Sequence, residues 1–260
     1  MDDIYQDYIN RVARLTLPAT CSLQLQSIQQ SPKFVDGKAT SFPGYSIVTP
    51  PGAEDRLNGD FYRQIEILQQ QLSLQLEPEL LIYLPAKSFH FTLADLIWDN
   101  TYSQVLETNP NFESNLQQRI ADIFQQYQYQ IEIVQPIRWQ LWGIVVRPRA
   151  VMACMVPENQ ESYDKIVELR RFIYQDKGLI GLGIEQQYDF TAHITLGYFN
   201  NIPGNLNRSS LCVTLSQIND RLLETQPPIF TIERAELRKF DSMINYYREL
   251  DWPTISFKNG

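Results

Sequence analysis

The chain contains only two histidines among 260 residues, and both begin the same four-residue pattern. His90 opens the run His-Phe-Thr-Leu, and His193 opens the run His-Ile-Thr-Leu. Side chains on a strand alternate between its two faces, so each run places an imidazole and a threonine hydroxyl on one face and two apolar side chains on the other. We therefore predict one strand with the same polar face in each half of the chain.

The two repeated patterns indicate phosphoryl-transfer chemistry. One His-x-Thr run in a strand is usually a half-buried histidine beside a surface threonine, but a repeat that uses both histidines favours a function. An imidazole takes or gives a proton near neutral pH, and a hydroxyl donates to a phosphate oxygen. We expect His90 and His193 to be the catalytic acid and base and Thr92 and Thr195 to bind phosphate, with no metal and no cofactor.

The elements expected around the motifs also repeat. Apolar spacing predicts helices at about residues 3–17, 60–76, 113–129, 161–175 and 208–224. Runs rich in β-branched and aromatic residues predict strands at about 45–49, 80–84, 88–98, 137–146, 150–156, 191–199 and 229–240. A helix, a strand with a histidine, a helix and a strand follow one another twice, so we expect an α+β fold with two similar lobes.

With both His-x-Thr-Leu runs in place, the chain resembles the 2H phosphoesterase superfamily, which includes RNA ligase-like 2′,3′-cyclic phosphodiesterases. His90 with Thr92 and His193 with Thr195 match the two motifs that define this superfamily. The resemblance implies a bilobal fold of two antiparallel sheets related by pseudo-twofold symmetry, with helices on the outer faces and the active-site cleft between the lobes. It also implies metal-independent hydrolysis of a 2′,3′-cyclic phosphate or a related phosphodiester.

The resemblance covers residues 42–240, which we expect to form one bilobal domain. Its lobes are expected at roughly residues 42–135 and 136–240. Residues 1–41 are interpreted as an N-terminal helix and loop extension, and residues 241–260 as a C-terminal extension. The roles of both extensions stay open at this stage.

Charge and composition limit the partners. The formal net charge of −8 argues against a long nucleic-acid duplex or an anionic membrane, because both are bound chiefly through Lys and Arg. Three scattered cysteines fit neither a zinc site nor a disulfide framework, which suggests buried reduced thiols. No long uncharged apolar run occurs. We expect a cytoplasmic protein, a monomer, that acts on a small nucleotide or a short RNA end.

Aromatic residues near the motifs are candidates for stacking on a base. Phe42, Tyr45, Trp98 and Tyr198 lie in or near the expected cleft strands, and Tyr45 and Tyr198 are the preferred pair. Aromatic residues in strands are more often core, so this interpretation competes with a structural one.

Charged residues near the motifs are given structural interpretations. Arg147 and Arg149 are expected at a solvated hairpin tip, and Arg238 in ordinary surface pairing with its acidic neighbours. Asp95 lies five positions after His90, so in a regular strand it points away from the histidine.

Two other functions remain compatible with these residues. The chain could be a non-catalytic module that binds or senses a nucleotide or RNA end, or an enzyme with RNA 2′-5′ ligase-like activity. The sequence does not separate hydrolysis from ligation, and it does not identify the natural substrate or which histidine is the base.

Overall fold

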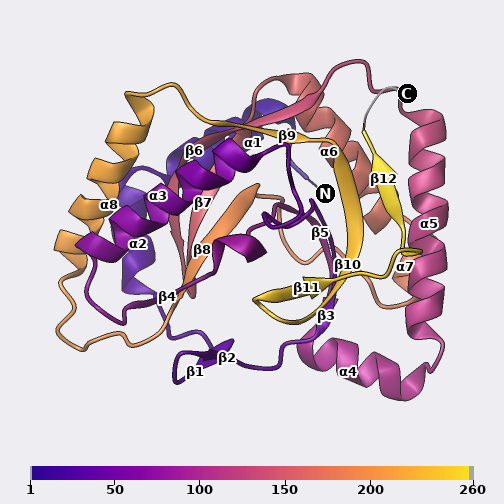
Figure 1. The fold of residues 1–260 in the computed structure, drawn as a ribbon, viewed down its shortest axis with the longest axis horizontal. Coiled ribbons are helices and arrows are strands. Elements are labelled where there is room, and N and C mark those ends of the chain that lie inside the picture. Colours follow the sequence, from indigo (N-terminus) through magenta and orange to yellow (C-terminus); the bar gives the residue numbers. More distant parts are fainter. Residues whose placement is uncertain (1, 258–260) are drawn as a thin grey trace.

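The computed structural model describes residues 2–257 as two five-stranded antiparallel sheets and a small two-stranded sheet, with helices packed around them (Figure 1). The helices are α1 (Tyr5–Leu15), α2 (Pro18–Gln26), α3 (Gly59–Gln75), α4 (Asp99–Thr108), α5 (Phe112–Gln130), α6 (Gln160–Tyr174), α7 (Lys177–Gly181) and α8 (Arg208–Leu223), with a 3-10 turn η1 (Ala86–Ser88). The strands are β1 (Phe34–Val35), β2 (Lys38–Ala39), β3 (Gly44–Val48), β4 (Leu81–Tyr83), β5 (Thr92–Trp98), β6 (Ile137–Arg147), β7 (Ala150–Pro157), β8 (His193–Phe199), β9 (Ile229–Ile232), β10 (Arg234–Ser242), β11 (Asn245–Tyr247) and β12 (Thr254–Ser256).

The first sheet has the order β11-β10-β3-β5, and β12 also pairs with β10. The second sheet has the order β4-β8-β7-β6-β9. Every pairing in the two sheets is antiparallel. The α+β fold of two antiparallel sheets predicted from the sequence is therefore confirmed, and each sheet holds one of the two motifs.

The two sheets exchange strands between the halves of the chain. β4 comes from the first half but pairs with β8 of the second sheet, with Leu81 opposite Phe199. β10 comes from the second half but pairs with β3 of the first sheet, with Leu237 opposite Ile47. The lobe boundary expected near residue 135 therefore does not separate the two sheets, because strand pairing crosses it in both directions.

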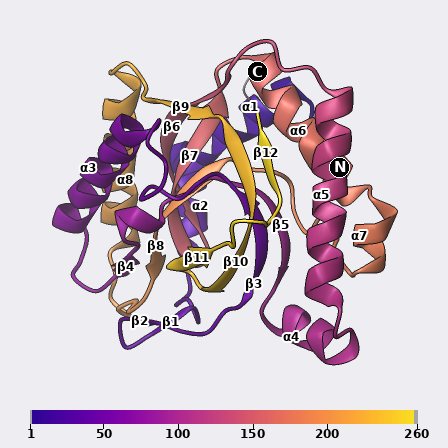
Figure 2. The ribbon, with the colours of Figure 1, turned by 45° about the vertical axis from the view of Figure 1, so that its right-hand side comes forward.

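Helices cover the outer faces of both sheets, as expected. α8 and α2 pack against β6, α1 packs against β7, and α6 contacts strands of both sheets. α5 packs against α6 and β12. Figures 1 and 2 show α3 and α8 at one side of the molecule and α5 at the opposite side, with the sheets between them. None of the helices within residues 2–257 combines the length and the apolar character needed to cross a membrane.

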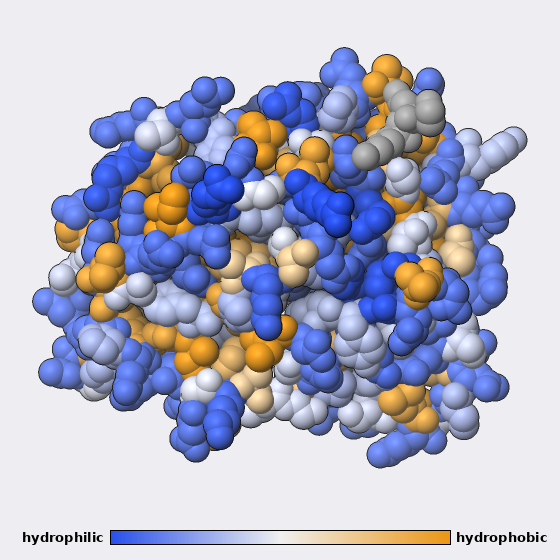
Figure 3. All heavy atoms as spheres, in the orientation of Figure 1, coloured by the Kyte–Doolittle hydropathy of each residue, from blue (hydrophilic) through white to orange (hydrophobic). Residues whose placement is uncertain are grey.

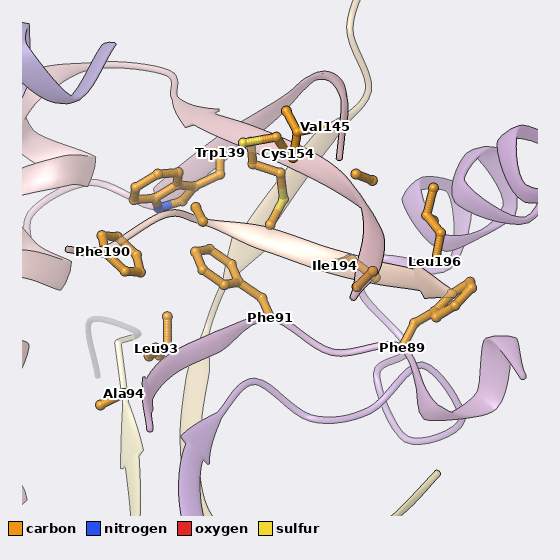
Figure 4. Close-up of a cluster of buried hydrophobic side chains, with 14 of the residues drawn as sticks. Phe89, Phe91, Leu93, Ala94, Trp139, Val145, Cys154, Phe190, Ile194 and Leu196 are labelled. Carbon is orange, nitrogen blue, oxygen red and sulfur yellow. The ribbon is translucent and has the colours of Figure 1, made fainter. Parts of the chain in front are cut away.

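The apolar residues of both motifs enter one core (Figure 4). Phe91, Leu93, Ile194 and Leu196 are all at most 1% exposed. The Phe91 ring packs edge-on against Trp139, with the ring centroids 5.4 Å apart. The two faces of each motif therefore separate as the alternation rule predicted, with the apolar side chains in the core.

The outer surface has a different character. On the face drawn in Figure 3, apolar residues are scattered among hydrophilic ones. Such mixing is ordinary for a solvent-exposed surface. The three cysteines, Cys21, Cys154 and Cys212, are free and buried, as the sequence suggested.

Several elements escaped the sequence analysis. Pro18 was expected to end the first helix, but it also begins α2, because proline is tolerated in the first turn, where no helical hydrogen bond is lost. β11 and β12 lie in the expected C-terminal extension and add to the first sheet through β10. The segment after residue 240 is therefore part of the sheet that carries His90.

Candidate active site

A cavity of about 750 Å³ lies between the two sheets, and both motifs line it. His90, Thr92, His193 and Thr195 all face this cavity. With Tyr198, which also lines the cleft, the structure thus brings together five of the six residues singled out from the sequence, from segments about one hundred positions apart. We call this cavity the cleft.

His90 lies just before β5 and not inside a strand, which corrects the expected strand start at residue 88. Its segment is still fixed to β3. The backbone oxygen of Phe91 accepts a hydrogen bond from the Thr49 backbone N–H at 2.9 Å, and the Phe91 N–H donates to Thr49 Oγ1 at 3.0 Å. The 3-10 turn η1 precedes His90, so the pairing between the β5 and β3 segments does not continue past Phe91. His90 is therefore held in the short segment between η1 and β5.

The two imidazoles are fixed by the same hydrogen bond. His90 Nδ1 lies 2.8 Å from the carbonyl oxygen of Ser88, and His193 Nδ1 lies 2.7 Å from the carbonyl oxygen of Thr191. A carbonyl oxygen only accepts, so Nδ1 of each ring carries the proton and donates it. Nε2 of each histidine is therefore the ring nitrogen left to exchange a proton with a ligand in the cleft.

A β-bulge at the last residue of each motif changes which of the following residues face the cleft. Along β5 and its partner, Ile47 is opposite Ala94 and Val48 is opposite Thr92, so Leu93 is an extra residue. Along β8, Gly197 and Thr195 are opposite Val151 and Met152, so Leu196 is an extra residue. An extra residue reverses the alternation beyond it.

The bulges bring Asp95 and Tyr198 into the cleft, each five positions after a histidine. The expectation that Asp95 points away was wrong, because it assumed a regular strand. Side chains from two helices donate to the displaced carbonyl oxygens, Arg170 of α6 being buried and Gln69 of α3 half-buried. Arg170 Nη1 donates to the oxygen of Leu93 at 2.6 Å, and Gln69 Nε2 donates to the oxygen of Leu196 at 2.8 Å.

Burial and charge set the titration of the two histidines. Burial lowers the pKa of His90 to about 4, and the Ser88 carbonyl and the Asp95 carboxylate only partly oppose this. Burial also lowers the pKa of His193, against the Thr191 carbonyl and Asp95. His193 lowers the pKa of His90 further by charge repulsion. Both imidazoles are therefore neutral in the empty cleft at neutral pH.

Asp95 is the carboxylate that both histidines sense. Its side chain accepts hydrogen bonds from Ser46 Oγ at 3.0 Å and from the Tyr188 hydroxyl. Its backbone oxygen accepts a bond from the Tyr174 hydroxyl at 2.8 Å. Asp95 is thus held in place by three donors, which suits it to favour the protonated form of a nearby imidazole.

The two tyrosines preferred for stacking have different positions. Tyr198 lines the cleft, and its hydroxyl donates to Met243 Sδ at 3.3 Å. Tyr45 does not line the cleft. It is fully buried on the other face of β3, where its hydroxyl donates to Glu113 Oε1 at 3.0 Å. Its neighbour Ser46 faces Asp95, so alternation turns Tyr45 away, and we withdraw it as a stacking residue.

Other aromatic rings do line the cleft. Phe42 and Trp98, the alternatives weighed in the sequence analysis, both face it. Tyr246 of β11 packs against the His90 ring, with the centroids 4.2 Å apart. Sequence reasoning missed Tyr246, because it lies in a short segment without a periodic pattern.

The basic residues differ from expectation in part. Arg149 lies exposed in the turn between β6 and β7, as expected, and reaches the rim of the cleft. Arg147, also expected at this solvated tip, is half-buried in β6 and lines the cleft together with Lys33 of the N-terminal segment. Arg238, expected at the surface, is 1% exposed and forms an ion pair of 2.6 Å with the buried Glu236. Its Nη1 donates to the Tyr246 backbone oxygen at 3.2 Å and so helps to hold Tyr246 beside His90.

Within residues 2–257, no group of three or more His, Cys, Asp and Glu side chains is arranged to hold a metal ion.

The sequence signal that could have identified Asp95 as a cleft residue is its spacing. Asp95 lies five residues after His90, and Tyr198 lies five residues after His193. No comparable signal marks Lys33.

Comparisons with known proteins identify similar folds. No model of a known protein family matches the chain, and no curated protein matches its sequence. A conserved protein of unknown function, ATU0111 from Agrobacterium tumefaciens str. C58, superposes with a TM-score of 0.58 at 15% identity, over 88% of this chain and 91% of that one. At this identity the match shows a shared fold.

Two looser structural matches carry functional names. A protein described as a phosphoesterase has a TM-score of 0.44 at 14% identity, over 82% of this chain and 98% of its own. E. coli LigT, solved in complex with 3′-AMP, has a TM-score of 0.41 at 13% identity, over 76% of this chain and 88% of its own. These similarities are too weak to assign a function, which we argue from the cleft itself.

Proposed function

We propose that this protein is a phosphoesterase of the 2H superfamily that hydrolyses a 2′,3′-cyclic phosphate or a related phosphodiester through His90 and His193. One observation carries the proposal. Two imidazoles in one cleft have the same tautomer, fixed by the same bond to a carbonyl oxygen two residues earlier, at 2.8 and 2.7 Å. Catalysis by a general acid and a general base requires two such groups facing one reacting phosphorus.

The reaction follows from the two free Nε2 atoms. Nε2 of one histidine takes a proton from water while the water oxygen bonds to phosphorus. The bond from phosphorus to the ribose oxygen breaks, and Nε2–H of the other histidine gives that oxygen a proton. Thr92 and Thr195 donate hydrogen bonds to the non-bridging oxygens, where negative charge gathers in the transition state.

This reaction requires one protonated imidazole, although both are neutral in the empty cleft. An anionic phosphate supplies the missing condition, because a nearby negative charge raises the pKa of an imidazole. The negative charge of Asp95 likewise raises the pKa of both histidines. The substrate therefore promotes the protonation state that its own hydrolysis needs.

The size of the cleft supports a small substrate. Its volume of about 750 Å³ lies in the usual range for pockets that bind small molecules. Tyr198, Phe42 and Trp98 offer faces for a base, and Arg147 offers a guanidinium to phosphate. We therefore propose a nucleotide or short RNA end as the substrate, with the chain acting as a monomer and without a cofactor.

The test is turnover of 2′,3′-cyclic nucleotides and short cyclic-phosphate RNAs in EDTA by the wild type, His90→Ala and His193→Ala. We expect hydrolysis by the wild type and its loss in both variants. Thr92→Val and Thr195→Val should lose less, on the order of 10-fold to 1000-fold, as for other lost transition-state donors. Saturable nucleotide binding without turnover by the wild type would instead indicate a sensor and contradict the proposal.

A further inference from the structure

The cleft contains a second cationic site beside the histidine centre, and the charge of one of its members, Lys33, lowers the pKa of His193. Lys33 and Arg149 both line it. Arg149 lies beside the end of β8, since its backbone oxygen accepts a hydrogen bond from the Phe199 N–H at 3.0 Å. Lys33 lies over the ring of Tyr198, at 5.2 Å from the ring centroid. Tyr198 and Phe199 are five and six residues beyond His193, which corresponds to at most roughly 16 and 20 Å along an extended strand.

Lys33 is held in place by its surroundings. The backbone N–H of Ser31 donates to the Phe199 oxygen at 2.8 Å, and the Thr40 N–H donates to the Lys33 oxygen at 3.0 Å. The Lys33 ammonium lies 4.3 Å from the centroid of Phe42. In Figures 1 and 2 the segment that carries β1 and β2 lies at the bottom of the molecule, below β4 and β8. This segment is thus anchored and forms one wall of the cleft.

Neither cation has an anionic partner within residues 2–257. Lys33 Nζ and the Arg149 guanidinium form no ion pair or hydrogen bond there, and the Lys33 ammonium lies over the rings of Phe42 and Tyr198. Asp95 and Asp99 lie close enough to raise the pKa of Lys33, but neither reaches ion-pair distance. Burial and the charge of Arg149 still lower that pKa to about 8.

Lys33 is half-buried and Arg149 is exposed, so the cost of holding two positive charges together without a counter-ion falls mainly on Lys33, the desolvated member of the pair. An anion that binds between them removes both the repulsion and the unmet hydrogen-bonding capacity. Arg149 offers a planar fork and Lys33 a compact charge, which together suit a phosphate group.

We propose that Lys33 and Arg149 form a subsite for a second phosphate of the substrate, on the 5′ side of the nucleoside whose phosphate reacts between the histidines. The substrate class is then a nucleotide with an additional 5′ phosphate or the 3′ end of an oligonucleotide, since both present the same phosphate chemistry. This inference rests on the proposed function, because it assigns a further contact to the same substrate.

The experiment compares calorimetric binding of 3′-AMP, adenosine 3′,5′-bisphosphate and the 3′-phosphorylated dinucleotide ApAp at constant ionic strength. It uses the full chain, and it requires no turnover because it measures binding. We expect the wild type to bind adenosine 3′,5′-bisphosphate about tenfold or more tightly than 3′-AMP, as one charge-assisted contact allows. A similar gain with ApAp would identify an oligonucleotide end as the source of the second phosphate, and a gain with the bisphosphate alone would identify a nucleotide.

The variants test where that gain arises. Lys33→Met and Arg149→Met should reduce the ratio of the two affinities towards one while the affinity for 3′-AMP changes less than about twofold, and Lys33→Arg should keep the ratio. Lys87→Met is the matched control, since Lys87 is exposed, does not line the cleft, and should leave the ratio unchanged. Thermal unfolding of each variant verifies that it folds.

Two outcomes contradict the inference and differ in meaning. If the wild type binds 3′-AMP and the bisphosphate equally, or if Lys33→Met and Arg149→Met keep the full ratio, the subsite is refuted and the histidine mechanism is unaffected. If the wild type binds none of the three nucleotides, the proposed function fails and the subsite fails with it.

Discussion

The protonation of the two histidines offers a direct physical test, because the proton NMR spectrum of this chain contains the signals of only two histidine rings. In the ligand-free protein we expect the His90 Cε1 proton to stay at its neutral chemical shift until the pH falls towards 4, because burial lowers the pKa of His90 to about 4. An unperturbed imidazole would titrate near 6.5.

An anion in the cleft should reverse this depression. A single negative charge about 5 Å from the ring, at an effective dielectric constant of about 20, contributes roughly 3 kcal/mol, which raises the pKa by about 2. A dianion should raise it by roughly twice as much. Sulfate is a suitable probe because it does not titrate near neutral pH, and saturating sulfate should move the pKa of at least one histidine to 6 or above.

The same depression predicts the pH dependence of stability. In the unfolded chain His90 has a pKa near 6.5, so between pH 6.5 and 4 the unfolded state binds more protons than the folded state. The free energy of unfolding should therefore fall as the pH is lowered through this window, by up to about 3 kcal/mol from His90. His90→Gln should remove that part of the loss. Titration of both histidines near pH 6.5 in the free protein, unchanged by sulfate, would refute this reasoning.

Two further expectations concern stability, measured by urea unfolding. Arg170→Met should cost about 3 to 5 kcal/mol, because it leaves the buried Asp2 carboxylate without its cationic partner, whereas Arg171→Met breaks only a half-exposed pair and should cost less than about 1 kcal/mol. Equal losses would contradict the buried ion pair. Gly44→Ala should cost about 1 to 3 kcal/mol, since a Cβ there would lie 2.3 Å from the Ile97 oxygen, whereas Gly59→Ala, with open space around it in α3, should be neutral or stabilising. A harmless Gly44→Ala would show that the strands are not packed as described.

The repeat of two short motifs was enough to predict the centre of the cleft. Alternation along a strand correctly separated His90 and Thr92 from Phe91 and Leu93, because it depends only on local backbone geometry. The same rule failed at Asp95, because the bulge at Leu93 depends on how β5 pairs with β3 and on the Arg170 side chain that satisfies its carbonyl oxygen.

Residues brought to the cleft by tertiary contacts could not be predicted in this way. Lys33 lies in a turn before β1 and Tyr246 in the three-residue strand β11, and the positions of these short segments depend on hydrogen bonds to distant strands and on Arg238. Tyr45 was misplaced for a related reason, since the face of β3 that meets the cleft is set by its register with β5. Spacing in the sequence carries no information about that register.

The most direct test of the central claim measures hydrolysis of one 2′,3′-cyclic nucleotide by the wild type, His90→Ala, His193→Ala and the double variant. If the two histidines act on one phosphate as acid and base, each single variant should lose about 10²-fold to 10⁴-fold in rate, and the double variant should lose little more than either. Losses that multiply in the double variant, or a single variant that keeps wild-type activity, would contradict a mechanism in which His90 and His193 work as one unit.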